Sequence, residues 1–136
     1  MTKLFILRFN LNTQFGTGHL FRAIALYNLI KAAENSARLH SLIFADDSLF
    51  SNYRHLLIEK NIEYTQFANI ADEFDIIDKL LKQSGEAGKI IVLDIKDTTQ
   101  EYMRLLKQRG LKIADFDDLG DGRDSVDILI DANVHT

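Results

Sequence analysis

The sequence Gln14-Phe15-Gly16-Thr17-Gly18-His19-Leu20-Phe21-Arg22 joins the first predicted strand to the first predicted helix. Residues 3–9 contain a short apolar run that is typical of a buried strand, and residues 20–36 carry apolar side chains at helical spacing. A glycine-rich turn between a strand and a helix favours an α/β fold, in which ligands bind beyond the carboxyl ends of the strands. Gly16 and Gly18 let a ligand approach the backbone, and the free N–H groups of the helix start favour an anion.

His19 falls in the first turn of the predicted helix and is a candidate base, because its ordinary pKa is near neutrality. The same residues also fit a tight connection with a solvated histidine, so the loop alone leaves both interpretations open. Two standard fingerprints are excluded. The dinucleotide-binding motif needs a third glycine where Phe21 stands, and the Walker A loop needs a lysine at the position of His19.

Composition narrows the class of protein. The chain has 136 residues, of which 46% are hydrophobic, so we expect one folded domain, 1–136. The net charge of -4 argues against nucleic acid as a partner. No apolar run is long enough to span a bilayer, the start does not resemble a secretory signal, and there is no cysteine. We expect a cytoplasmic protein.

Predicted strands and helices alternate along the rest of the chain, which indicates a doubly wound, mostly parallel Rossmann-like sheet with helices on both faces. The further strands are expected at 39–45, 64–67, 89–94, 111–116 and 126–131, and the further helices at 46–61, 68–83 and 98–109. Parallel strands bring their carboxyl ends to one edge of the sheet. The polar residues expected at that edge are Asn10, Asp46, Asp47, Asp94, Asp117, Asp118 and Asn133.

The sequence from Gln14 to Arg22 resembles the first loop of a nucleotide-sugar family. That family includes the UDP-sugar hydrolase of pseudaminic acid biosynthesis and spore-coat polysaccharide biosynthesis proteins; the glycosyltransferase that makes peptidoglycan lipid II is a more distant likeness. Arg8 ends the first strand, as the family's arginine does. Three later segments resemble the family's apolar strand ending in Asp, its Phe-Asp-Asp turn and its last strand: Leu93-Asp94, Ala114-Asp115-Phe116-Asp117-Asp118 and Val126-Asp127-Ile128-Leu129-Ile130-Asp131-Ala132-Asn133. These four landmarks occur in the family's order and cover nearly the whole chain.

The resemblance implies the N-terminal half of a GT-B architecture, whose C-terminal nucleotide-binding domain is absent here and would come from the same or another chain. It implies a UDP-sugar substrate, hydrolysed or used for glycosyl transfer in surface polysaccharide or nonulosonate biosynthesis without a metal or cofactor. His19 takes the place of the family's proposed catalytic base. The residues expected to bind substrate are Asn10, Gly16, Thr17, Gly18, Arg22, Asp117, Asp118 and Asn133. Arg22 is interpreted as a phosphate contact, with a solvated helix residue as the alternative.

The sequence departs from the family at two points. The usual Arg-x-Asp after the first strand is Arg8-Phe9-Asn10, so an amide replaces a carboxylate. The hydrolase's His-Tyr pair after the fourth-strand Asp is Ile95-Lys96, which leaves a different sugar or a transferase activity open. A non-catalytic module that binds a sugar phosphate or docks a partner enzyme is the alternative function.

The remaining candidate sites have ordinary explanations. The aspartates after Asp115 do not form a calcium loop, because Leu119 and Val126 stand at ligand positions. Asp121 and Asp124 are interpreted as residues of a polar turn, and Thr98 or Asp97 as the cap of the next helix. The remaining histidines have no metal-ligand spacing; His40 is expected before a strand, His55 on a helix and His135 in the tail.

Overall fold

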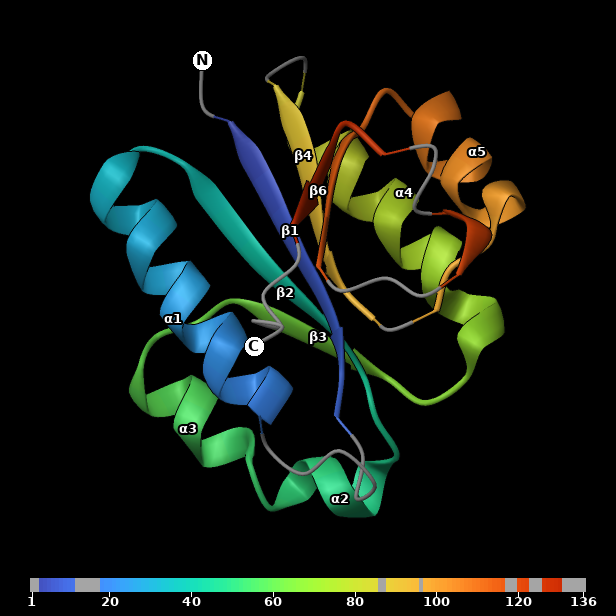
Figure 1. Cartoon of the computed structure of the whole chain (residues 1–136). Helices are drawn as coiled ribbons and strands as arrows, with labels where there is room; N and C mark the ends of the chain where they lie inside the picture. Colours follow the sequence, from blue (N-terminus) through green and yellow to red (C-terminus); the bar gives the residue numbers. More distant parts are fainter. Residues whose placement is uncertain are drawn as a thin grey trace, which may run out of the picture.

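The computed structural model describes residues 3–11, 18–85, 88–95, 97–116, 120–122 and 126–130, with the backbone alone at 18–19 and 129–130. Within these residues the chain forms a six-stranded sheet in the order β3-β2-β1-β4-β5-β6, with every neighbouring pair parallel (Figure 1). The strands are β1 (Leu4–Asn10), β2 (Arg38–Phe44), β3 (Tyr64–Phe67), β4 (Lys89–Asp94), β5 (Lys112–Phe116) and β6 (Ile128–Ile130). The helices are α1 (Gly18–Ala33), α2 (Asp47–Ser51), α3 (Arg54–Glu59), α4 (Glu73–Gln83) and α5 (Gln100–Gln108), with a 3-10 turn η1 (Ile70–Asp72) before α4.

The strand order is the doubly wound one of Rossmann-like folds, so the predicted fold class is confirmed. From β1 the chain moves outward to β2 and β3, then returns across the sheet to β4 and continues outward to β5 and β6. The direction of winding therefore reverses between β1 and β4, which lie side by side with Arg8 opposite Leu93 and Phe9 opposite Asp94. Ligands of open α/β sheets bind in the crevice at such a switch point.

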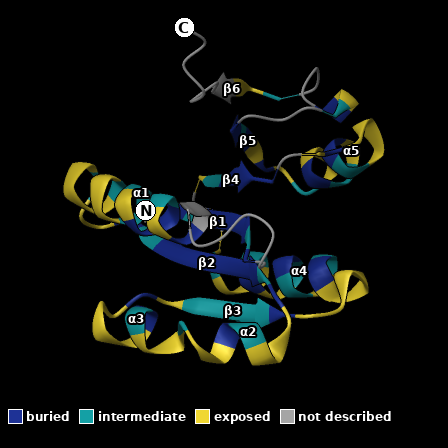
Figure 2. Cartoon of the chain, turned by 60° about the horizontal axis from the view of Figure 1, so that its bottom comes forward, coloured by how far each residue is buried: buried dark blue, intermediate teal, exposed yellow. Residues whose placement is uncertain are grey.

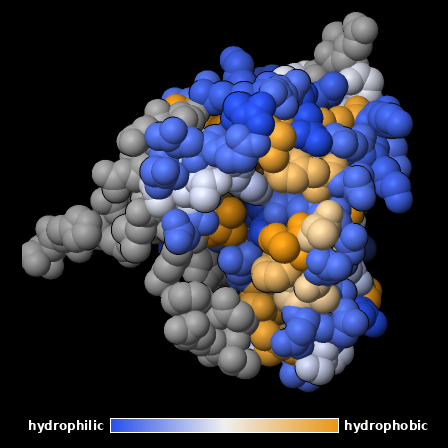
Figure 3. All heavy atoms as spheres, turned by 90° about the vertical axis from the view of Figure 1, so that its right-hand side faces the viewer, coloured by the Kyte–Doolittle hydropathy of each residue, from blue (hydrophilic) through white to orange (hydrophobic). Residues whose placement is uncertain are grey.

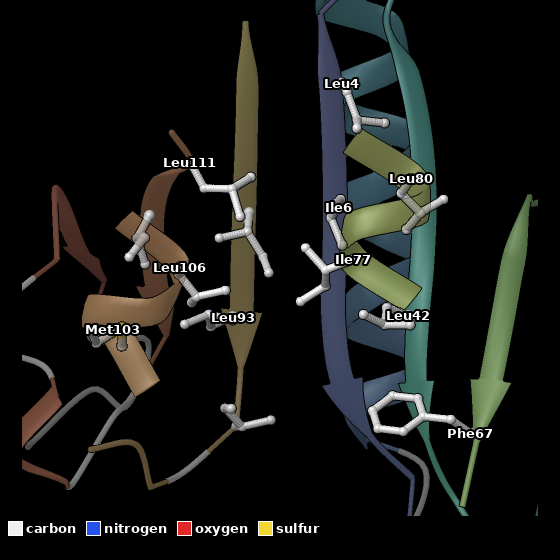
Figure 4. Packing of buried hydrophobic residues seen from close by; sticks show 13 residues of the cluster. Leu4, Ile6, Leu42, Phe67, Ile77, Leu80, Leu93, Met103, Leu106 and Leu111 are labelled. Atoms are coloured by element: carbon white, nitrogen blue, oxygen red, sulfur yellow. The ribbon is translucent and has the colours of Figure 1, made fainter. Parts of the chain in front are cut away.

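Helices cover both faces of the sheet, which explains the continuous apolar runs in its central strands. Helix α1 lies over one face, and α4 and α5 lie over the other (Figures 1 and 2). The core beneath α4 and α5 joins side chains from the central strands and both helices (Figure 4). Its labelled members include Leu4, Ile6, Leu42, Phe67, Ile77, Leu80, Leu93, Met103, Leu106 and Leu111. Alternate strand residues point to the α1 side, where Leu7, Phe9, Leu39 and Ile43 are buried.

Several helix boundaries differ from the sequence prediction for local reasons. The single helix expected at 46–61 is two short helices, because α2 ends at its C-cap Asn52 and α3 starts after Tyr53. Asp46 caps α2, since its side chain accepts a hydrogen bond from the Leu49 N–H. The cap of α5 is Thr99, not Thr98 or Asp97: the Thr99 hydroxyl accepts from the Tyr102 N–H. Gly110 follows α5 with a φ of 78°, as expected for a helix-terminating glycine.

Candidate functional site

The structure brings several of the predicted site residues to the carboxyl edge of the sheet. Asn10 is the last residue of β1, next to the end of β4 at Asp94, and α1 starts with Gly18 and His19. Arg22 lies further along α1, and its guanidinium reaches Asp94. Gly16, Thr17, Asp117, Asp118 and Asn133 lie outside the described residues, and the side chain of His19 is not described.

Arg22 ties α1 to the ends of two strands. Its Nη1 lies 3.2 Å from Oδ1 of Asp94, and its Cζ lies 5.5 Å from the centre of the Phe116 ring. The side chain of Asp94 is 7% exposed, whereas that of Arg22 is 33% exposed. The Arg22 side chain therefore links α1 to the end of β4 and stays partly accessible to solvent. Whether it contacts a phosphate stays a prediction.

A second arginine, Arg8 of β1, occupies the opposite face of the sheet and is buried. Its Nε and Nη2 lie 3.1 and 3.4 Å from the two carboxylate oxygens of Glu73, the first residue of α4. Both side chains are 2% exposed. The guanidinium also lies over the Phe67 and Phe44 rings, 5.0 and 5.8 Å from their centres. A buried charge needs such a partner, because removal from water is otherwise very costly.

Tyr102 of α5 completes the buried cluster by donating a hydrogen bond from its hydroxyl to Oε2 of Glu73. Burial, with the negative charge of Glu73 as a further cause, raises the pKa of Tyr102 well above its ordinary value. Asp115 of β5, fully buried, adds to that shift. The Tyr102 hydroxyl is therefore a permanent donor at neutral pH. Sequence reasoning missed Glu73 and Tyr102; the one available signal was a charged residue, Arg8, inside an apolar strand.

Asn10 is linked to this cluster through Arg8. The Nη1 of Arg8 donates to the Phe9 carbonyl at 3.0 Å and to Oδ1 of Asn10 at 2.8 Å. Asn10 is half-buried, at the point where β1 leaves the sheet. The side chain of Asn10, a predicted crevice residue, is thus held by the buried Arg8.

Residues that follow β4 and β5 are hydrogen-bonded to each other near this edge of the sheet. Thr98 is buried, and its carbonyl accepts a hydrogen bond of 3.2 Å from the Gly122 N–H. Asp121 Oδ1 accepts one of 3.1 Å from the Gln100 N–H at the start of α5. Asp121, predicted as an ordinary turn residue, therefore also helps to cap a helix.

The two described histidines outside the glycine loop have structural surroundings. His40 lies within β2 and not before it, and it is buried, with Nε2 2.7 Å from the Thr65 hydroxyl and Nδ1 3.3 Å from a Glu63 carboxylate oxygen. Burial lowers the pKa of His40 below its ordinary value, against the opposing effect of Glu63. His55 is exposed on α3. The described part of the chain holds no group of three or more His, Cys, Asp or Glu side chains able to bind a metal, and His135 lies outside it.

The described surface offers weaker candidates elsewhere. A hollow of about 500 Å³ at the amino ends of β4 and β5 is lined by Lys3, Lys89, Arg109 and Lys112. Of these, Lys3 is paired with Glu34 and Arg109 with Asp78. On the side of α4 and α5, apolar residues gather amid a hydrophilic surface (Figure 3). No described helix is long and apolar enough to cross a membrane.

Comparisons with known proteins add no functional assignment. No protein-family model and no curated protein matches the sequence. Among solved structures, the chain is similar to eIF2B delta from Chaetomium thermophilum, with 9% sequence identity and a TM-score of 0.45. The match covers 95% of this chain and 49% of that one, so the chain spans about half the length of that protein. The resemblance to the nucleotide-sugar family therefore rests on the sequence landmarks alone.

Proposed function

We propose that this chain is the N-terminal, base-bearing domain of a cytoplasmic GT-B enzyme that hydrolyses a UDP-sugar or transfers its glycosyl group in surface-glycan synthesis. The observation that carries the proposal is the agreement between the family's landmarks and the sheet. Arg8 lies near the end of β1 and Asp94 ends β4, and these are the two strands that flank the switch point. Substrates of doubly wound folds bind there.

The chemistry assigned to the site follows from the residue types. His19, in the first turn of α1, would take a proton from water or from an acceptor hydroxyl as the attack on the sugar begins. The positive end of the helix favours the neutral imidazole and an anionic leaving group at the same place. A second α/β domain, in the same or another chain, would bind most of the nucleotide.

The test is UDP release from a panel of UDP-sugars by the chain together with its second domain. We expect His19→Ala to lower kcat by at least about a hundredfold, the lower end of what a general base contributes. His55→Ala, which removes an exposed histidine from α3, is the matched control and should keep full activity. Circular dichroism of both variants checks that they fold.

Full turnover by folded His19→Ala would exclude the base role. If no UDP-sugar is turned over but the chain still binds its second domain or a sugar phosphate, the alternative applies, namely a non-catalytic module. Turnover thus separates the two functions.

A further inference from the structure

The buried arginine decides which atom of Asn10 faces outward. A guanidinium has five N–H donors and no acceptor, so the Asn10 atom 2.8 Å from the Arg8 Nη1 must be the side-chain oxygen. This contact fixes the orientation of the amide. The amide nitrogen, Nδ2, is then the end that remains for a ligand. Within the described residues, no group accepts a hydrogen bond from it.

The rest of the network prevents Arg8 from turning away. Two of its nitrogens are engaged by the Glu73 carboxylate, and its Cζ lies 5.0 Å from the centre of the Phe67 ring. Tyr102 in turn holds Glu73. A planar guanidinium with a two-point partner has one orientation, and in that orientation Nη1 points at the end of β1. Asn10 is therefore orientated before any ligand arrives.

The same contact makes Asn10 a better donor. Accepting a hydrogen bond from a cation draws electron density toward Oδ1, which polarises the N–H bonds at the other end of the amide. A carboxylate at this position would instead place a negative charge and acceptor oxygens at the edge of the sheet. The replacement of Asp by Asn thus reverses the hydrogen-bonding character of the position.

We infer that Asn10 Nδ2 donates a hydrogen bond to a phosphoryl oxygen of the substrate, and that Arg8 is the positioning residue that orientates it. This inference rests on the proposed function, because the diphosphate is the part of a nucleotide sugar that carries acceptors and no donors. It deepens that function by assigning the anionic group, and not a sugar hydroxyl, to the end of β1.

The experiment titrates the isotopically labelled chain with inorganic diphosphate and follows the side-chain N–H signals of Asn10 by NMR. Their absence in Asn10→Asp identifies them. In the native chain they should shift progressively at millimolar diphosphate, and Asn10→Asp should weaken binding by at least about tenfold. The control Asn28→Asp makes the same charge change on the exposed side of α1 and should leave the affinity unchanged.

The positioning role of Arg8 has its own readouts. Arg8→Lys keeps the charge but loses the planar fork, so we expect altered Asn10 signals and weaker diphosphate binding. The control Arg104→Lys makes the same change at an exposed arginine of α5 and should bind diphosphate normally. A measurement on the native chain covers the case in which Arg8→Lys does not fold. Without diphosphate, the Asn10 amide should relax like the rigid backbone of β1, and a freely rotating amide would overturn the role of Arg8.

Three results would contradict the contact between Asn10 and a phosphoryl oxygen. They are no binding of diphosphate at millimolar concentration, binding without a shift of the Asn10 signals, and equal diphosphate affinity in Asn10→Asp. Each can be told apart from failure of the proposed function. If UDP release depends on His19 and any of these three results is also found, the proposed enzyme activity stands and the Asn10 contact is rejected. Diphosphate binding at Asn10 without UDP release keeps the contact and rejects the enzyme.

Discussion

Two arginines near the carboxyl edge of the sheet have similar partners and different surroundings. Arg8 and Arg22 each pair with a carboxylate, and each guanidinium lies near an aromatic ring. Arg8 is 2% exposed and lies under α4 and α5, whereas Arg22 on the other face is 33% exposed. The kinds of group that an arginine contacts therefore do not by themselves distinguish the two roles. The exposed fraction of its side chain does. Arg8 is fixed scaffold, and Arg22 remains accessible.

The difference follows from where the two residues are attached. Arg8 belongs to a central strand, with neighbouring strands on both sides and helices above it, so its charge had to be matched inside the protein. Arg22 belongs to a covering helix, so part of its side chain stays at the surface. Mutations should separate the two cases by the size of their effect on stability.

The largest effect is expected for Glu73→Ala, which leaves the Arg8 charge buried without its main partner. We expect a loss of about 3–5 kcal/mol in the free energy of unfolding, as for other broken buried ion pairs. Urea denaturation measures it. The control Glu101→Ala removes the carboxylate of an exposed pair with Arg104 and should cause no measurable change. Equal effects of the two substitutions would mean that the Arg8 pair is not a buried one.

An intermediate effect is expected for Gly122→Ala. Gly122 contacts the loop that follows β4, the strand that ends at Asp94, the partner of Arg22. A Cβ on Gly122 would meet the Thr98 hydroxyl and come within 2.8 Å of the Thr99 carbonyl. Overpacking of this kind costs about 1–3 kcal/mol in unfolding free energy. Gly88→Ala is the matched control, because its nearest contact would be an ordinary 3.6 Å to Lys3. Similar urea midpoints for both variants would show that the loops after β4 and β5 are not tightly packed.

The smallest effect is expected for Arg22→Gln. Arg22 is 33% exposed, and Gln can still donate a hydrogen bond toward the buried Asp94, so the unfolding free energy should fall by only about 1 kcal/mol. Urea denaturation beside Glu73→Ala makes the comparison direct. A loss as large as that of Glu73→Ala would make the two arginines equivalent and remove the distinction between scaffold and accessible residue.

Much of the fold was predictable from local sequence. The strand at 64–67 and the strand at 89–94 agree with the structure to the residue, because apolar β-branched and aromatic runs between turn residues are local signals. The break at Asn52 within the helix expected at 46–61 was not predictable, because apolar residues continue at helical spacing through it. Of the candidate site, Asn10 and Asp94 were found as strand ends. The roles of His19, Asn10 and Arg22 in binding or catalysis stay predictions.

What the sequence by itself determined is the alternation of strands and helices, the α/β class and the position of the glycine loop between β1 and α1. These features depend on residues close together in the chain. Only the tertiary structure decided that Arg8 meets Glu73, 65 residues away, and that Arg22 meets Asp94, 72 residues away. The physical reason is the strand order. The return of the chain from β3 to β4 beside β1 brings these pairs together, and no local periodicity encodes that crossing.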